Sequence, residues 1–139
     1  MEDLYKKFPF IKTNIEVKDG WKTLIDDCLT EIKDLMDGFS VGTIKEKFGG
    51  IRIYIEPDED KYPNYFLGID NNTYRHICSI VSKYEHMSYK ICEVCGKEGK
   101  LQTKNNWLKT LCIDHNKDYK NVVGFLMDLS DQVNESVKP

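Results

Sequence analysis

The chain has 139 residues, of which 40% are hydrophobic and 31% charged, and its formal net charge at pH 7 is −3. This size predicts one compact domain, or a domain with a small appended module, and excludes a large multidomain enzyme. The first residues lack the long apolar core of a secretory signal, and no stretch approaches the ~20 apolar residues that a membrane helix needs. We therefore expect a soluble protein of the cytoplasm.

The charged residues are unevenly distributed along the chain. Residues 1–88 have a net charge of −4 and residues 121–139 one of −2, whereas residues 89–120 hold seven lysines against four acidic residues, a net charge of +3. The chain also has five cysteines, an odd number, and a reducing compartment disfavours a fully paired disulfide framework. Metal binding is therefore the first expectation for the cysteines.

A first helix is predicted by the spacing of apolar residues between Asp19 and Gly38, which are the expected cap and the expected stop. Its apolar stripe comprises Trp21, Leu24, Ile25, Cys28, Leu29, Ile32, Leu35 and Met36. Cys28 lies within this stripe, so we interpret it as a small core residue. A short turn or helix is expected before it, at the N-terminus.

Two strands follow, FSVGTIKEKF and IRIYIE, separated by Gly49 and Gly50. Because both glycines can take positive φ, this pattern predicts a β-hairpin with a two-residue turn at Gly49-Gly50. In the resulting register Lys47 faces Arg52, and the apolar face of the hairpin should pack on the core. That face comprises Ile44, Phe48, Ile51, Ile53, Ile55 and, as an unexpected acidic member, Glu46.

The opposite face of the hairpin is basic, and it carries Lys45, Lys47, Arg52 and Tyr54. Two like charges that lie directly opposite each other destabilise a strand pair unless an anion relieves them. This face is therefore a candidate binding surface for a phosphate, a nucleic-acid backbone or an acidic protein. The alternative is that these side chains are only solvated or pair with Glu46 and Glu56, and a β-bulge would rearrange both faces.

An acidic loop with two prolines follows the hairpin. Its carboxylates could bind Mg²⁺ or act as acid and base, although a solvated loop is the preferred interpretation. These carboxylates are Glu56, Asp58, Glu59 and Asp60.

Two further helices are predicted, one from about Asn72 to Ser88 and a closing amphipathic helix after the cysteine-rich segment. The buried stripe of the first comprises Ile77, Ile80, Val81, Tyr84 and Met87, and that of the second Val122, Phe125, Leu126, Leu129 and Val133. The order of elements predicts an α+β fold. In it, residues 1–88 form the core, and residues 89–139 form a zinc module and a closing helix packed on that core.

The strongest pattern in the chain is a pair of metal-ligand motifs. Cys92-x2-Cys95 and Cys112-x2-His115 are separated by sixteen residues. Tetrahedral zinc needs such an arrangement, because each pair can span one edge of the tetrahedron while the insert returns the chain to the metal. Four protein ligands leave no open position for water or substrate, so we expect one structural Zn²⁺.

The residues around the two pairs fit a module that resembles a treble-clef finger. Gly96 and Gly99 should provide positive φ after the first pair, and Asn105-Asn106 the turn of a small hairpin. The second pair should open a helix whose N-terminal dipole faces the thiolates. The negative charge of the site should be offset by Lys97, Lys100 and Lys109.

Enzyme activity is not expected. Treble-clef scaffolds also occur in HNH-type nucleases, which place a general-base histidine between the two ligand pairs, but here that insert holds no histidine. His115 is itself a ligand, and His76 and His86 both precede the module. A catalytic pair of Cys78 with either of them lacks the surroundings of an activated nucleophile.

The hairpin motif and the zinc motif together resemble a family of uncharacterised bacterial and phage-encoded small proteins. In that family a K-E-K-F-G-G hairpin, as at Lys45 to Gly50, precedes a C-terminal zinc module with a Trp and a Thr-Leu-Cys before the last ligands. Trp107 and Thr110-Leu111-Cys112 match this pattern, and the likeness covers roughly residues 20–120. The resemblance implies a fold and a metal rather than an activity.

These features predict a non-enzymatic, zinc-stabilised binding protein that acts through a protein partner, and a phage product that inhibits a host or defence factor would fit. The first alternative is a nucleic-acid or nucleotide binder that uses the basic zinc module and the hairpin face, with an aromatic ring to stack on bases. A metal-dependent nuclease is the second alternative. The candidate binding residues are Lys45, Lys47, Arg52, Tyr54, Lys104, Trp107 and Lys109.

Overall fold

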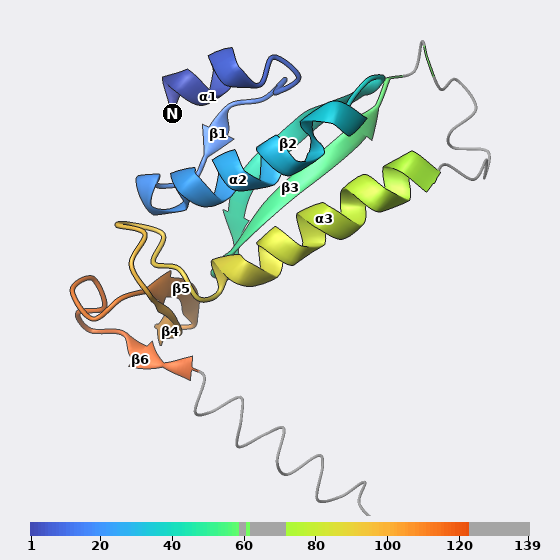
Figure 1. The fold of residues 1–139 in the computed structure, drawn as a ribbon. Helices are drawn as coiled ribbons and strands as arrows, with labels where there is room; N and C mark the ends of the chain where they lie inside the picture. Colours follow the sequence, from blue (N-terminus) through green and yellow to red (C-terminus); the bar gives the residue numbers. More distant parts are fainter. Residues whose placement is uncertain (59–60, 62–71, 123–139) are drawn as a thin grey trace, which may run out of the picture.

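The computed structural model describes residues 1–58, 61 and 72–122 of the chain (Figure 1). In chain order the elements are α1 (Glu2–Lys7), β1 (Ile15–Glu16), η1 (Asp19–Trp21), α2 (Lys22–Ile32), η2 (Lys33–Leu35), β2 (Phe39–Lys47), β3 (Gly50–Pro57), α3 (Asn72–Ser88), β4 (Lys100–Lys104), β5 (Trp107–Leu111) and β6 (Lys120–Asn121). The strands form two three-stranded sheets, in the orders β1-β2-β3 and β5-β4-β6. The predicted α+β class is confirmed.

The core lies between α2 and the first sheet. In Figure 1, α2 crosses in front of the β2–β3 hairpin. Residues of its predicted apolar stripe, among them Leu24, Ile25 and Leu29, belong to one buried core cluster with residues of both strands. The predicted helix is broken: its α-helical part covers only Lys22–Ile32, and the flanking residues form the 3-10 turns η1 and η2, which end at Leu35. Gly38, with a φ of 86°, lies in the turn before β2, and Asp19 begins η1 and does not act as a side-chain cap. The fully buried core residues include Leu4, Phe8, Trp21, Ile25, Leu29, Ile32, Val41, Ile51 and Ile77.

The β2–β3 hairpin turns one residue earlier than predicted. Lys47 pairs with Gly50, so Phe48 and Gly49 form the turn, with φ values of 55° and 85°. The predicted turn at Gly49-Gly50 and its register are therefore wrong, and Lys45, not Lys47, lies opposite Arg52. Phe48, which was expected in the core, is 63% exposed at the tip of the hairpin.

Tertiary packing explains why the two glycines do not form the turn together. A Cβ on Gly50 would lie 2.4 Å from Cζ of Tyr89, and a Cβ on Gly49 would lie 2.4 Å from Cδ1 of Leu101. Both glycines thus allow close approach of neighbouring segments, and only Gly49 also needs its positive φ. A β-bulge between Val41 and Thr43 lies farther from the tip, beyond the basic residues.

Helix α3 runs beside β3 and covers its free edge (Figure 1). The Ile51 N–H donates to Ser88 Oγ at 3.0 Å, and the Ile53 N–H donates to Glu85 Oε2 at 3.1 Å. An edge strand otherwise presents unpaired backbone groups that can recruit another chain. Side chains of α3 therefore accept the backbone N–H groups at this edge, in place of a further strand.

The bounds of α3 match the predicted helix, but fewer residues of its predicted stripe are buried. Ile77 and Val81 are buried, whereas Met87, which was expected in the stripe, is 43% exposed. Most of the predicted closing helix lies outside the described residues, and of its stripe only Val122 is described, as a buried residue. Within the described part of the chain, no helix is long and apolar enough to cross a membrane.

Candidate metal centre

The four predicted ligands converge on one point next to the second sheet. Cys92 and Cys95 lie in the turn that follows α3, Cys112 directly follows β5, and His115 lies in the next turn. The ligand atoms of all four lie within 4.8 Å of one another. The Sγ atoms of Cys95 and Cys112 are 3.6 Å apart, and His115 Nδ1 lies 3.2 Å from Cys112 Sγ and 3.7 Å from Cys92 Sγ.

The turn that carries the first ligand pair is closed by backbone hydrogen bonds. The Gly96 N–H donates to Cys92 O at 2.9 Å, and the Cys92 N–H donates to Lys97 O at 2.8 Å. Gly96 has the predicted positive φ, 84°. Gly99 does not have a positive φ. Close packing requires a glycine there, because a Cβ would lie 2.8 Å from Cys92 N.

The second ligand pair lies in a turn and does not open a helix. The His115 N–H donates to Cys112 O at 3.1 Å, and the chain then continues into β6, which pairs with β4. The predicted helix at this pair is therefore wrong. The predicted β4–β5 hairpin is present, and its turn residues Asn105 and Asn106 have φ values of 51° and 66°.

Backbone amides, in place of a helix dipole, stabilise thiolate at the site. Burial by itself raises the pKa of the Cys92 thiol, but hydrogen bonds from the amides of Cys112, Cys95 and Val94 outweigh it and lower the pKa to about 7. Burial raises the pKa of Cys112, and the neighbouring thiols add to that effect. The Cys92 thiol therefore loses its proton more readily near neutral pH than an ordinary thiol does.

The lysines that were expected to offset the site have separate roles. Lys97 lies 3.3 Å from Asp114, and Asp114 together with the cysteines Cys95 and Cys112 raises the pKa of Lys97. Lys109 does not offset the charge of the ligand cysteines, because its Nζ lies 2.5 Å from Glu46 and 3.3 Å from Glu93.

Three thiols and one imidazole, held this close together, fit one metal ion. Their separations suit a tetrahedron with metal–sulfur bonds of about 2.3 Å and a metal–nitrogen bond of about 2.1 Å. The described residues contain this one cluster of potential ligands. A metal ion bound there would cross-link the turn after α3 to the turn after β5.

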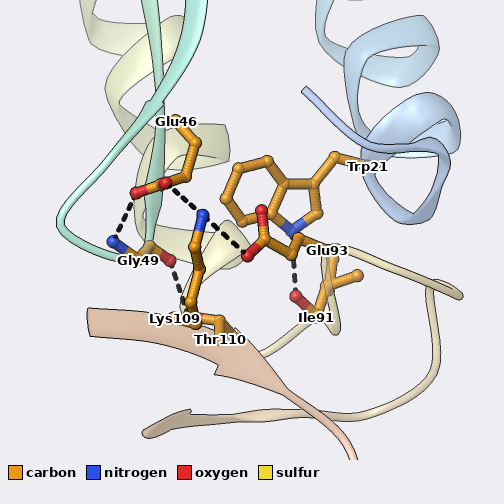
Figure 2. Close-up of polar contacts among 7 residues, drawn as sticks. All are labelled: Trp21, Glu46, Gly49, Ile91, Glu93, Lys109 and Thr110. Carbon is orange, nitrogen blue, oxygen red and sulfur yellow. Dashed lines mark hydrogen bonds and ion pairs between the residues drawn. The ribbon is translucent and has the colours of Figure 1, made fainter. Parts of the chain in front are cut away.

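Hydrogen bonds from the first ligand turn join the metal module to the N-terminal end of α2. The Gly20 N–H donates to Glu93 O at 2.9 Å, and the indole N–H of Trp21 donates to Ile91 O at 2.9 Å (Figure 2). A Cβ on Gly20 would lie 2.1 Å from Cys92 O, so only glycine permits this approach. The ligand turn therefore packs directly on η1.

A second junction joins the module to the tip of the β2–β3 hairpin. Figure 2 shows Lys109 between the carboxylates of Glu46 and Glu93. Glu46 also accepts the Gly49 N–H at 2.9 Å, and Gly49 O accepts the Thr110 hydroxyl at 2.6 Å. The two motifs that the sequence places far apart are thus in direct contact.

At this junction one ammonium group faces two carboxylates. Burial raises the pKa of Glu93, whose residue is 1% exposed, and the Lys109 charge opposes this rise. Burial alone lowers the pKa of Lys109, but its hydrogen bond to Glu46 and the charges of both glutamates outweigh burial and raise it. Glu46 and Glu93 were not predicted as site residues, although an acid on the apolar face of the hairpin was a signal for a buried cationic partner.

The predicted binding residues are distributed over three places. Lys45 and Arg52 are opposed on the open face of the first sheet, and Arg52 donates to the Tyr89 hydroxyl at 3.2 Å. Tyr54 on the same sheet is 46% exposed. The Lys47 ammonium lies 5.7 Å from the Phe48 ring centroid at the tip. On the second sheet lie Lys104, near the Tyr119 ring, the exposed Trp107, and Lys109.

The groups considered for catalysis are separate from the metal centre. Burial raises the pKa of the Cys28 thiol to about 12, and its expected place in the core is confirmed. Cys78 is half-buried on α3, and His76 and His86 are exposed on the same helix. Of the acidic loop, Glu59 and Asp60 lie outside the described residues.

No family model, no curated protein and no solved structure matches this chain. The resemblance to small bacterial and phage-encoded proteins therefore stays a prediction.

Proposed function

We propose that the chain is a non-enzymatic binding protein of the cytoplasm, stabilised by one structural zinc ion, that acts by docking on a protein partner. The observation that carries this proposal is the tip of the β2–β3 hairpin. There Phe48 is exposed to solvent, while the backbone around it is held by the metal module.

The donor set supports zinc as the metal. Cysteine thiolates are soft ligands that disfavour Mg²⁺ and Ca²⁺, and three cysteines with one histidine are a common donor set of structural zinc. Four protein ligands complete the tetrahedron, so the ion would stabilise the fold without binding a substrate. Zinc binding in comparable peptides is worth ~10–16 kcal/mol at neutral pH, as much as the whole net stability of a typical domain. Thiolate ligands also fit a reducing compartment.

Neither local conformation nor core packing explains the phenylalanine at the hairpin tip. Phe48 holds the first turn position with a φ of 55°, where Asn, Asp or Gly is preferred and a bulky side chain costs about 1 kcal/mol or more. Because the residue is 63% exposed, burial of its side chain offsets little of that cost. An aromatic side chain of this kind is typical of an interface anchor, which is buried only when the partner binds.

Hydrogen bonds also tie the tip to β2 and to the metal module. Gly49 is hydrogen bonded to Glu46 on one side and to Thr110 on the other, and Gly50 packs on Tyr89. Such preorganisation lowers the entropy cost of association. In this proposal, the metal module supports the tip and so contributes to binding indirectly.

The partner is tested by affinity purification from the source cell with the wild-type chain and the variants Phe48→Asn and Ile113→Asn. Asparagine suits the left-handed turn, so Phe48→Asn should fold normally and still lose at least ~30-fold in partner affinity, as expected for an anchor worth about 2 kcal/mol. Ile113 is 86% exposed on the metal module and provides the matched control, which should retain the partner. Equal recovery of the same protein by wild type and Phe48→Asn would contradict the proposal.

The metal is tested separately. Elemental analysis of the purified protein should show about one zinc per chain, which Cys112→Ser should lose. In a Trp107→Phe background, a chelator should shift the Trp21 emission to longer wavelength, because the buried indole donates to Ile91, next to the first ligand. A different metal at full occupancy would contradict the zinc assignment.

A second candidate function, nucleic-acid or nucleotide binding, is favoured by the open face of the first sheet. Lys45 and Arg52 lie directly opposite each other there, and within the described residues neither forms an ion pair with an acidic side chain. Binding through this face should weaken steeply as salt rises and be reduced in Lys45→Ala. The absence of any mobility shift at low salt, together with no binding in a nucleotide panel, would exclude this candidate.

A further inference from the structure

A groove with a volume of about 600 Å³ lies on one face of the second sheet. Its lining comes from β4, the central strand, from the end of β5 with the second ligand turn, and from the segment that leads into β6. This volume falls within the range of small-molecule sites. Neither Phe48 at the hairpin tip nor the open face of the first sheet contributes to the groove.

The central strand contributes the side chain of Gln102 to this groove. The residue is 4% exposed, and within the described part of the chain its amide forms no hydrogen bond. Glu93 Oε1 is the one fully buried side-chain polar atom without a partner among the described residues, so the Gln102 amide still reaches the open space of the groove. A nearly buried amide that makes no hydrogen bond costs free energy. Because this group is both a donor and an acceptor, it favours a ligand that offers an acceptor and a donor side by side.

Two lysines flank Gln102 on the same face of β4. Lys100 and Lys104 lie two residues before and two residues after it, and side chains at that spacing on a strand point to the same face. Both lysines are exposed, and among the described residues neither has an acidic partner in an ion pair. Glu98 is the one acidic residue of the lining, so the two lysines leave the groove with an excess of positive charge. An anionic group of a ligand would be stabilised beside them.

Two aromatic rings lie beside these lysines. Tyr119 lines the groove, and its ring centroid is 5.8 Å from the Lys104 ammonium. Trp107 lies directly opposite Lys104 in the β4–β5 register, on the same face, and is 65% exposed. Packing within the chain does not account for so exposed an indole. Bases of nucleic acids stack on exposed aromatic rings, while basic side chains next to those rings hold the phosphates.

We propose that this groove binds a nucleotide, a function beyond partner docking and at a site separate from the first sheet. The edge of the base would meet the Gln102 amide, which can donate and accept at once, as glutamine does with adenine. The base would stack on Tyr119, and the phosphate would lie beside Lys100 and Lys104. A simple anion would leave the amide oxygen without a donor, and an apolar ligand would leave both the amide and the lysines unpaired. Trp107 offers a ring to a neighbouring base, so a single strand should bind more tightly than a free nucleotide.

The test uses the full-length, metal-loaded protein and the 5′-mononucleotides of the four bases, each examined at about 1 mM by ligand-observed NMR. At least one mononucleotide should bind. Its nucleoside, which lacks the phosphate, and ribose 5-phosphate, which lacks the base, should each bind at least ~10-fold more weakly. Absence of binding by every mononucleotide and by single strands, or equal binding of either fragment, would overturn the proposal.

Single-stranded oligonucleotides of the preferred base identify the source of the ligand. Measured by fluorescence anisotropy at about 50 mM salt, a strand should bind at least ~5-fold more tightly than the mononucleotide, and Trp107→Ala should remove this gain. Equal affinities of strand and mononucleotide would support a free nucleotide as the ligand.

Variants place the ligand in the groove. Gln102→Met keeps the length of the side chain and removes its amide, and Lys104→Met removes a charge beside Tyr119; each should weaken binding at least ~10-fold. Lys90→Met changes an exposed lysine outside the groove, so it is the matched control and should bind normally. If Gln102→Met does not fold, Lys104→Met decides, because its side chain is at the surface. Wild-type affinity in Lys104→Met would show that the ligand binds elsewhere and would overturn the proposal.

Discussion

The buried ion pairs of Lys109 allow a direct test of how the hairpin and the metal module are joined. Lys109→Met keeps most of the aliphatic volume of the side chain and removes its ammonium group. The carboxylates of Glu46 and Glu93, which are 15% and 2% exposed, then lose their shared cation. The variant therefore leaves the nearly fully buried carboxylate of Glu93 without its ion-pair partner.

Removing one partner of a buried ion pair typically costs 3–5 kcal/mol, whereas an exposed pair contributes roughly 0–1 kcal/mol. Glu93 belongs to the class of buried pairs, whereas Glu46, whose side chain is 15% exposed, can be partly hydrated. We therefore expect Lys109→Met to lower the free energy of unfolding by about 3 kcal/mol, which is roughly 150-fold in the folding equilibrium constant.

Urea unfolding of the metal-loaded protein, followed by tryptophan fluorescence, to which the buried Trp21 contributes, measures this change. The double variant Glu93→Gln/Lys109→Met should recover a large part of the loss, because it removes the buried charge together with its partner. The double-mutant cycle should thus give a coupling of at least ~1 kcal/mol between Glu93 and Lys109. A loss below ~1 kcal/mol for Lys109→Met, with additive effects in the cycle, would refute the reasoning.

The same junction predicts a pH dependence. Burial raises the pKa of Glu93 in the folded chain, so the folded state binds this proton more tightly than the unfolded state does. The free energy of unfolding therefore falls as pH rises from the ordinary carboxyl range through the folded-state pKa. Lys109→Met should shift this loss of stability to higher pH, because the Lys109 charge lowers the pKa of Glu93. Glu93→Gln should abolish it. The metal ligands are the same in all variants, so differences between their stability–pH curves isolate Glu93.

Three further predictions concern packing and thiol access. Ser88→Ala should cost about 1–3 kcal/mol in urea unfolding, because the Ile51 N–H at the edge of β3 loses its acceptor in a buried place; an unchanged midpoint would contradict this role. Gly20→Ala should lower the melting temperature and cost at least ~2 kcal/mol, since its Cβ would lie 2.1 Å from Cys92 O; wild-type melting would show that the ligand turn does not pack on η1. Cys28 should react with a thiol reagent at pH 8 only after unfolding, because the residue is buried and burial raises its pKa to about 12; labelling of the native protein, detected by mass spectrometry, would contradict this.

The local patterns of the sequence predicted the elements that depend on short-range interactions. The four ligand candidates, the bounds of α3 and the β4–β5 turn at Asn105-Asn106 all agree with the structure. Each depends on residues within one or two turns of the chain, where spacing and φ preference decide the outcome. The same reasoning correctly placed Cys28 in the core, because a helical stripe is also a local pattern.

The register of the β2–β3 hairpin could not be predicted in this way. Two adjacent glycines permit either of two turns, and the choice between them depends on Tyr89 and Leu101, which pack on Gly50 and Gly49. The sequence pattern contains no information on that packing. The result moved Phe48 from the expected core to the surface, where it now carries the proposed interaction with a partner.

The role of Lys109 was missed for a similar reason. It was predicted as a basic surface residue near the metal, and its partner Glu46 is 63 residues away in the sequence. Charge attraction at that separation acts only after the fold has brought the two segments together. The acid on the apolar face of the hairpin and the lysine in the metal module were visible separately, but their pairing was not.

The sequence by itself thus determined the α+β class, the cluster of four potential metal ligands and the bounds of α3, since these depend on local periodicity and spacing. Only the tertiary structure decided where the hairpin turns, which charges are buried and how the metal module meets the first sheet. The physical reason is that close packing and buried charge are properties of segments distant along the chain. The proposed docking tip at Phe48 depends on that second class of information.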